Sequence, residues 1–293
     1  MGRWSRPSAP SSAEVPFIHQ ALRYAGTDGL LAGLLPYVRE GLERGEPVRV
    51  AARPQTLEPL RAALGADTPV ELLEIDRNPA RIIPFWREFV ETHRGPVRGV
   101  GEPIWPGRNG AELVECQLHE SLLNIAFEED FNLLCPYDAV GCSESVLHEA
   151  CCSHPVVDGA PSPHYRAEPL PLAPLPPPPS GARVLGFEIE TLSEVRQLVR
   201  DAGGDPDFVL AVDELAINSV EHGGGRGIVR LWKEEDALVC DVRDQGIIRD
   251  PLAGRLRPEV DAFSGRGLWI ANAVCKLVQI RPGLVRIRSA PVH

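Results

Sequence analysis

Two polar side chains in the last third of the chain have types and a spacing that suit phosphate chemistry. Glu214 and Asn218 lie four residues apart, so on a helix they share one face. Magnesium prefers oxygen ligands, and one amide oxygen completed by phosphate oxygens and water satisfies it. A carboxylate one turn earlier can accept a proton from an attacking hydroxyl group. The pair predicts Asn218 as a magnesium ligand and Glu214 as a general base, although an isolated pair of this kind is more often a solvated helix face.

A second segment supplies a group that could read an adenine base. Leu238 to Arg243 alternates like a strand and ends at Asp244-Gln245-Gly246, where the glycine permits a turn. A carboxylate at a strand end can accept the exocyclic amine of adenine, which guanine lacks. We therefore expect Asp244 to contact adenine beside Gly246. The alternative is an aspartate that only forms a turn.

A third segment predicts a binding loop for phosphates, formed by Gly265, Arg266, Gly267 and Leu268. Glycines let the backbone approach an anion closely, and the N–H groups at the start of the following helix favour negative charge. Such a pattern is weak by itself, because many helices follow a glycine loop. The polar loop from Ile247 to Phe263 has a suitable length to cover a bound nucleotide.

The elements around these segments predict a second domain with both helices and strands. Apolar residues at helical spacing, with a proline in the first turn of one segment, predict two helices ahead of the strands. The expected helices are 192–201, 206–221 and 268–275, and the expected strands are 227–233, 238–243, 277–281 and 284–288.

The first half of the chain alternates between helical and strand patterns. This alternation predicts an α/β layered fold with a mostly parallel sheet, whose strand ends are where such sheets tend to bind ligands. The expected helices are 29–44, 56–64, 78–92 and 111–126, and the expected strands are 47–52, 70–75 and 132–138.

Composition divides the chain. At 293 residues it exceeds one average domain. Nine prolines between Pro161 and Pro179 can neither build a helix nor join the interior of a sheet. We expect a disordered tail at 1–15, a sensory domain at 16–158, a proline-rich linker at 159–181 and a nucleotide domain at 182–293.

Charge and hydropathy exclude several classes of function. The formal net charge of −11 and the absence of a basic run argue against direct nucleic-acid binding. No apolar stretch is long enough to span a bilayer, so we expect a cytoplasmic protein without a membrane partner. A crowded group of cysteines and histidines lacks the paired spacing of structural zinc sites: Cys135, Cys142, His148, Cys151, Cys152 and His154. We therefore expect its cysteines to be ordinary thiols and no metal site.

The first domain resembles the MEDS family of sensory modules. The resemblance rests on the segments His19 to Tyr24, Gly101 to Trp105, Glu115 to Glu120 and Cys135 to Asp138. It implies that this domain senses a signal, which could be a small-molecule ligand. Each aromatic or histidine in these segments also has an ordinary role in a core or at its rim.

The second domain resembles the GHKL ATPases, and within them the RsbW-type anti-sigma serine kinases. The resemblance rests on three motifs in the family order: the helix that carries Asn218, the turn Asp244 to Gly246 and the turn Gly265 to Leu268. The resemblance implies a Bergerat α/β sandwich that binds ATP and magnesium. It implies the same roles for Glu214, Asn218 and Asp244 and places His222 near the phosphates. Two departures concern turnover or affinity: Ile248 stands where a second glycine is usual, and Leu284 replaces a threonine after Gly283.

Three functions remain open. The first is an anti-sigma factor and Mg-ATP-dependent kinase that binds a sigma factor and phosphorylates a serine on an anti-anti-sigma (STAS) protein. The second is a sensor histidine kinase, which needs a helical hairpin with a phospho-accepting histidine where this chain has prolines. The third is a binding module that only sequesters its partner. A homodimer is compatible with each of them.

Overall fold

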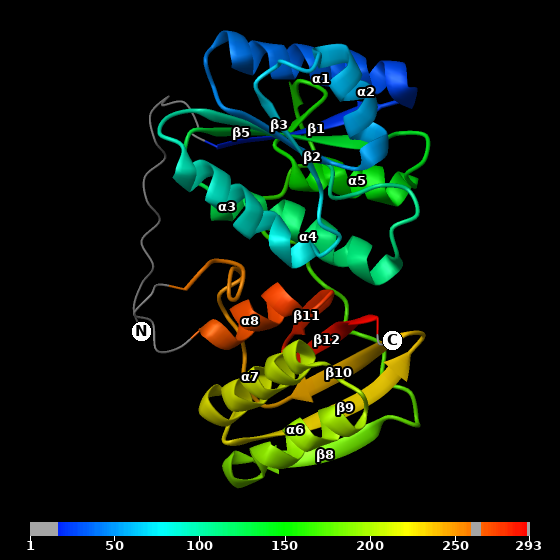
Figure 1. Ribbon diagram of the computed structural model, residues 1–293, viewed down its shortest axis with the longest axis vertical. Coiled ribbons are helices and arrows are strands. Elements are labelled where there is room, and N and C mark those ends of the chain that lie inside the picture. The colour runs from blue at the N-terminus through cyan, green and yellow to red at the C-terminus, as the bar shows by residue number, and fades with distance from the viewer. Residues whose placement is uncertain (1–16, 259–264, 292–293) are drawn as a thin grey trace.

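The computed structural model describes residues 17–258 and 265–291. Two α/β units lie one above the other in Figure 1, and each has its own sheet. The predicted tail at 1–15 lies outside the described residues, as does Phe263 at the end of the predicted cover loop. No helix in the described part of the chain is both long and apolar enough to cross a membrane.

Sheet A belongs to the first domain and is parallel except at one edge, which confirms the predicted fold class. Its strand order is β3-β2-β4-β5-β1-β6-β7, and only β7 runs antiparallel to its neighbour. Every residue of β2 and β4 is buried, as expected for a parallel sheet covered on both faces. The strands are β1 (Phe17–Tyr24), β2 (Val48–Ala52), β3 (Val70–Glu74), β4 (Val97–Gly101), β5 (Phe131–Asp138), β6 (Val156–Val157) and β7 (Ala160–Pro161).

Helices cover sheet A on both faces (Figure 1). One layer contains α1 (Gly26–Glu43) and α2 (Pro54–Leu64), and α1 buries Leu30, Leu34 and Val38 at a spacing of four residues. The other layer contains the 3-10 turn η1 (Pro79–Arg81), α3 (Ile82–Thr92), α4 (Gly110–Ala126) and α5 (Glu144–Ser153). The second layer faces the second domain.

Part of the predicted pattern for the first domain needs correction. The helix expected at 78–92 is divided into η1 and α3, because Pro84 lacks the N–H group that a continuous helix would direct at Ala80. Strand β4 was not predicted, since its two glycines obscure the pattern. At Gly99 a Cβ would lie 2.8 Å from Trp86 Cζ3, so this glycine makes room for the indole ring. Elements β1, α5 and β8 were also not predicted.

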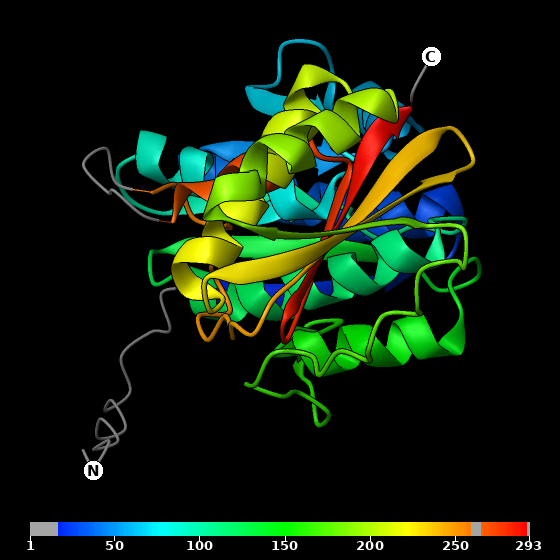
Figure 2. The same cartoon turned by 90° about the horizontal axis from the view of Figure 1, so that it is seen from below.

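Sheet B belongs to the second domain and is antiparallel, in the order β11-β12-β10-β9-β8. Helices α6 and α7 lie along one side of its strands (Figure 2). Helix α7 starts where Asp205 accepts a hydrogen bond from Phe208 N and Pro206 occupies the first turn. The elements are β8 (Arg183–Glu188), η2 (Ile189–Thr191), α6 (Leu192–Asp201), α7 (Pro206–His222), β9 (Arg226–Glu234), β10 (Ala237–Arg243), α8 (Arg266–Val274), β11 (Leu277–Arg281) and β12 (Leu284–Pro291).

The proline-rich segment between the two sheets is packed against both domains. Leu170 and Leu172 contact the core of the first domain. Arg281 and Arg286 of sheet B donate to the carbonyl oxygens of Ala173 and Pro176, at 3.0 and 2.9 Å. Its backbone carbonyls, free of helix and sheet pairing, therefore accept hydrogen bonds from the second domain.

Candidate functional site

A cleft of about 340 Å³ in the second domain gathers most of the residues that the sequence singled out. Its walls come from the end of α7, the turn after β10, the start of α8 and the β11–β12 hairpin. Six of the nine predicted site residues line it: Asn218, His222, Asp244, Gly246, Gly265 and Leu268. Glu214, Arg266 and Gly267 are not among its described lining residues.

The Asp244 carboxylate is held in one orientation by two donors. Ser219 Oγ donates to Oδ2 at 2.6 Å, and Gly246 N donates to Oδ1 at 2.7 Å. A Cβ at Gly223 would lie 2.4 Å from Asp244 Cγ, so only a glycine allows the carboxylate to sit there. Each carboxylate oxygen keeps a further lone pair that can accept a hydrogen bond from a ligand.

Sequence reasoning missed the supporting roles of Ser219 and Gly223. Both residues lie inside the segment that carries Asn218, so their place in that segment was the available sign that they belong to the site. Their partner Asp244 is more than twenty residues away, and only the packing of α7 beside β10 shows which side chain they support.

Helix α8 packs its first turn closely against α7 through Gly267. A Cβ there would lie 2.4 Å from Asn218 Nδ2 and 3.2 Å from Glu214 O. Glu214 itself is half-buried one turn before Asn218. Burial raises the pKa of its carboxyl, and the negative charges of Asp213 and Glu221 raise it further. The carboxylate is therefore a stronger base than an exposed glutamate.

The N-terminus of α8 borders the cleft through Gly265 and Leu268. Its N-cap, Gly265, has φ of 87° and no side chain to accept from the first N–H groups of the helix. Those groups suit an anion, since they carry the positive end of the helix dipole. Arg266 is exposed beside them.

The described part of the cover loop leaves the cleft and reaches the first domain. Ile247 and Ile248 line the cleft, and the φ of Ile248 is not positive, so this departure from glycine causes no backbone strain there. Arg255 is buried, and its Nε donates to His119 Nε2 on α4 at 3.2 Å. Burial and the Arg255 cation lower the pKa of His119 to about 3, so the neutral ring can accept this bond.

Comparison with protein families gives a separate match for each domain. Residues 18–155 match the MEDS family, the MEthanogen/methylotroph, DcmR Sensory domain. Residues 187–288 match the histidine kinase-like ATPase domain. The chain carries a MEDS domain followed by a histidine kinase-like ATPase domain. No curated protein matches the chain.

The two matches confirm both family resemblances at the level of the domain. The family of the second domain implies ATP binding, and a sensory domain joined to it is the arrangement of a signalling regulator. The RsbW-type branch, the serine kinase activity and the individual site residues remain predictions.

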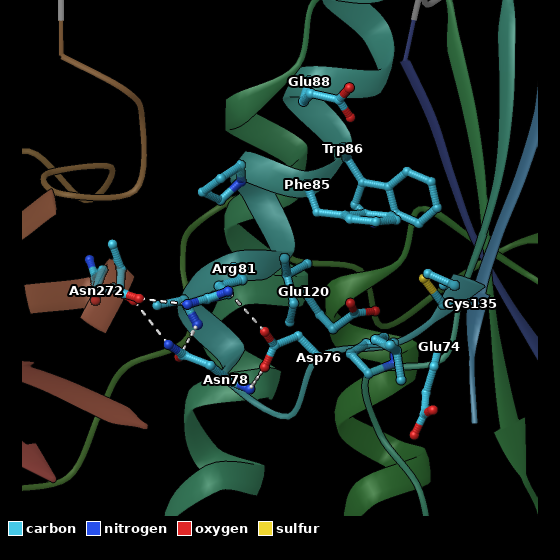
Figure 3. A pocket seen from close by; sticks show the side chains of 18 of the residues that line it. Glu74, Asp76, Asn78, Arg81, Phe85, Trp86, Glu88, Glu120, Cys135 and Asn272 are labelled. Carbon is cyan, nitrogen blue, oxygen red and sulfur yellow. Dashed lines mark hydrogen bonds and ion pairs between the residues drawn. The ribbon is translucent and has the colours of Figure 1, made fainter. Parts of the chain in front are cut away.

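The MEDS domain contains a second hollow, of about 490 Å³, near the carboxyl ends of β2, β3 and β4 (Figure 3). This is the region of a parallel sheet where a ligand was expected. Aromatic rings of α3 form one wall, and Glu120 and Cys135 lie at its depth. Among the described residues of the ATPase domain, three also line it, all from α8: Trp269, Asn272 and Ala273.

Helix α8 borders both the cleft and the MEDS hollow. Leu268 lines the cleft, and the next residue, Trp269, lines the MEDS hollow. At the other end of the helix, Asn78 Nδ2 donates to the carbonyls of Asn272 and Cys275, at 2.9 and 2.8 Å. Arg81 Nη2 donates to Ala273 O at 2.6 Å. The MEDS domain thereby satisfies carbonyl groups that a helix C-terminus leaves unpaired.

Proposed function

We propose that the protein is an ATP-dependent signalling regulator that phosphorylates a serine or threonine of an anti-anti-sigma (STAS) protein and binds a sigma factor. The observation that supports it best is the convergence on one cleft of an oriented carboxylate, an amide side chain and the N-terminus of a helix. These come from Asp244, Asn218 and Gly265, three separate segments of the chain.

The residues present fit ATP and magnesium. Asp244, oriented by Ser219 and Gly246, would accept the exocyclic amine of adenine. Asn218 would offer its amide oxygen to magnesium, which binds phosphate oxygens when present. The first N–H groups of α8 would hold the phosphates, and Gly267 keeps that helix end close to Asn218.

Glu214 would accept the proton of the attacking hydroxyl group. Burial and neighbouring negative charges raise the pKa of Glu214 toward neutral pH. A general base works best when its pKa is close to the working pH. The remaining contribution of the protein is to position the two reacting groups, because phosphoryl transfer depends mainly on positioning and electrostatic stabilisation.

Control by the MEDS domain would act through α8 and the cover loop. A ligand in the MEDS hollow would contact Trp269 and Asn272 on the helix whose first turn borders the cleft. The Arg255–His119 contact joins the cover loop to the same domain. A ligand regulates a protein by binding one of two conformations more tightly than the other. Its contacts with Trp269 and Asn272 would therefore have to differ between the two conformations of the protein.

The segment before the ATPase domain favours a phosphate acceptor in a separate protein, because its described residues lack the element that a histidine kinase uses as its acceptor. Between β7 and β8 the described chain contains no helix, and prolines occupy much of it. A histidine kinase needs a helical hairpin at that position. We therefore place the histidine kinase reading below transfer to a serine of a partner.

A phosphotransfer assay with labelled ATP and a panel of STAS proteins tests the proposal. We expect label on a serine or threonine of one of them. Label on a histidine of this chain would instead support a histidine kinase. Tight binding of a sigma factor with no transfer would leave a binding module, and the serine kinase proposal would be wrong.

A further inference from the structure

Four side chains in the interior of the MEDS domain converge on one point. They are His19, Glu120, Cys135 and His154, and their ligand atoms all lie within 4.8 Å of one another. Each is at most 1% exposed. They come from β1, α4, β5 and the end of α5, so four elements position one polar group inside a core.

Strand pairing brings two of these residues together. β1 and β5 run parallel with Ala21 opposite Cys135, and His19 lies two residues before Ala21, on the same face of the sheet. That face is covered by α4 and α5, which supply the other two side chains. His19 Nε2 lies 3.5 Å from Cys135 Sγ and 3.6 Å from Glu120 Oε2.

Hydrogen bonds at the outer ring nitrogens determine what the two histidines present to the centre. The amide nitrogen of Asn124 donates to Ser153 O, so its oxygen faces His19 Nδ1 at 3.2 Å and accepts from that nitrogen. His154 Nδ1 lies 2.8 Å from Ala150 O, which also accepts. In the neutral rings the proton is then on Nδ1, and both Nε2 lone pairs point inward.

The inward lone pairs face a carboxylate. His154 Nε2 lies 3.0 Å from Glu120 Oε2, yet it has no hydrogen-bond partner of acceptable geometry among the described residues. Glu120 Oε1 is also buried without a partner in the described part of the chain. Lone pairs of neutral imidazole and carboxylate repel one another in a low-dielectric interior, so a cation between them would relieve a substantial cost.

We infer that His19, Glu120, Cys135 and His154 bind one divalent transition metal of the zinc class. Two imidazoles, one thiolate and one carboxylate suit zinc and disfavour magnesium or calcium, which take oxygen ligands. Ligand atoms bound at about 2.1 Å in a tetrahedron lie roughly 3.4 Å apart. The separations of 3.0, 3.5 and 3.6 Å given above are close to this value, and all four ligand atoms lie within 4.8 Å of one another. The two anionic ligands also neutralise the charge of the metal.

The surroundings of the group match those of metal sites. Each histidine is oriented through its second nitrogen by an oxygen acceptor, as metal-bound histidines usually are. Tyr137 donates to Glu120 Oε2 at 3.1 Å and orients that carboxylate. Glu120 and Cys135 also border the MEDS hollow, which provides a path by which a metal can enter (Figure 3).

The full-length protein, stripped with a chelator and titrated with Co²⁺ or Zn²⁺, tests this inference. We expect one bound metal per chain, and a thiolate-to-cobalt charge-transfer band with Co²⁺. The band should disappear in Cys135→Ser and persist in Cys152→Ser, which removes a buried thiol 3.7 Å from His148 but outside the group.

A second variant keeps the test independent of losing a ligand. Asn124→Ala retains all four ligands and removes the acceptor that orients His19. We expect it to keep the stoichiometry and the band while binding the metal roughly 10- to 100-fold more weakly. Absence of tight metal binding by the wild type would overturn the inference and leave an imidazolium–carboxylate pair. Equal binding by Cys135→Ser would place the metal elsewhere.

Discussion

The cleft of the ATPase domain and the hollow of the MEDS domain border the same helix but are built in opposite ways. The cleft uses short stretches of chain, and the polar side chains predicted to bind a ligand there, Asn218, His222 and Asp244, are half-exposed or exposed. The depth of the hollow holds Glu120 and Cys135, fully buried beside two histidines that come from distant parts of the chain. Exposed polar groups are solvated until a ligand arrives, whereas buried ones must be satisfied within the fold.

This difference separates the expected effects of mutation. In the cleft, a lost polar group should reduce binding or turnover and leave the fold intact. Around the hollow, a lost polar group leaves a buried partner unsatisfied and should reduce stability as well. The following predictions test that separation, starting with the largest effect.

Glu214→Gln should reduce phosphotransfer by roughly 10²- to 10⁴-fold, since it removes the proposed base. ATP affinity measured by calorimetry should stay within a few-fold of the wild type. Glu194→Gln on α6, which neutralises an exposed carboxylate away from the cleft, is the control and should retain activity. Normal turnover in Glu214→Gln would show that another group accepts the proton.

Asp244→Asn should weaken ATP binding by roughly 10- to 100-fold, because a hydrogen bond to a charged group contributes about 1.5 to 3 kcal/mol. The melting temperature without ATP should change little. Asp207→Asn, on the exposed first turn of α7, removes the same charge elsewhere and should bind ATP normally. Unchanged affinity in Asp244→Asn would contradict the adenine assignment.

Asn78→Ala should reduce the free energy of unfolding by about 1 to 3 kcal/mol, because two carbonyls at the end of α8 lose a buried donor. ATP affinity should also fall, since the same helix borders the cleft. Chemical denaturation and calorimetry on one preparation measure both effects. A loss of stability with unchanged ATP affinity would mean that α8 does not couple the MEDS hollow to ATP binding in the cleft.

Asp213→Asn should move the acidic limb of the pH–turnover profile to lower pH by less than about one unit. Asp213 raises the pKa of Glu214, and a base with a raised pKa loses activity as the pH falls through that value. Removing the negative charge lowers the pKa, so activity should persist to lower pH. A shift toward higher pH would mean that Glu214 does not control this limb.

Much of the fold could be predicted because its helices and long strands have clear apolar periodicity. The ends of α1, α7 and β11 differ from the prediction by a few residues at most. β1 and β4 were not predicted because His19 and Arg98 are polar yet buried, and because Gly99 makes room for the Trp86 ring of α3. Periodicity cannot reveal a buried polar residue whose partner is distant in the chain.

Most residues of the candidate ATP cleft could likewise be predicted from the sequence, because they lie in three short motifs. The support of Asp244 by Ser219 and Gly223 required the packing of α7 beside β10. The same limit applies to the crowded cysteines. Cys135 and His154 do join a polar group, but with His19 and Glu120 and not with their neighbours in the sequence.

The sequence by itself therefore determined the two-domain α/β organisation, the ATPase motifs and the resemblance of the first half to a sensory module. Periodicity and local motifs carry that information, because it depends on residues a few positions apart. Only the tertiary structure decided that α8 borders both hollows and that His19, Glu120, Cys135 and His154 meet. Those contacts arise from strand pairing and helix packing between residues up to about two hundred positions apart.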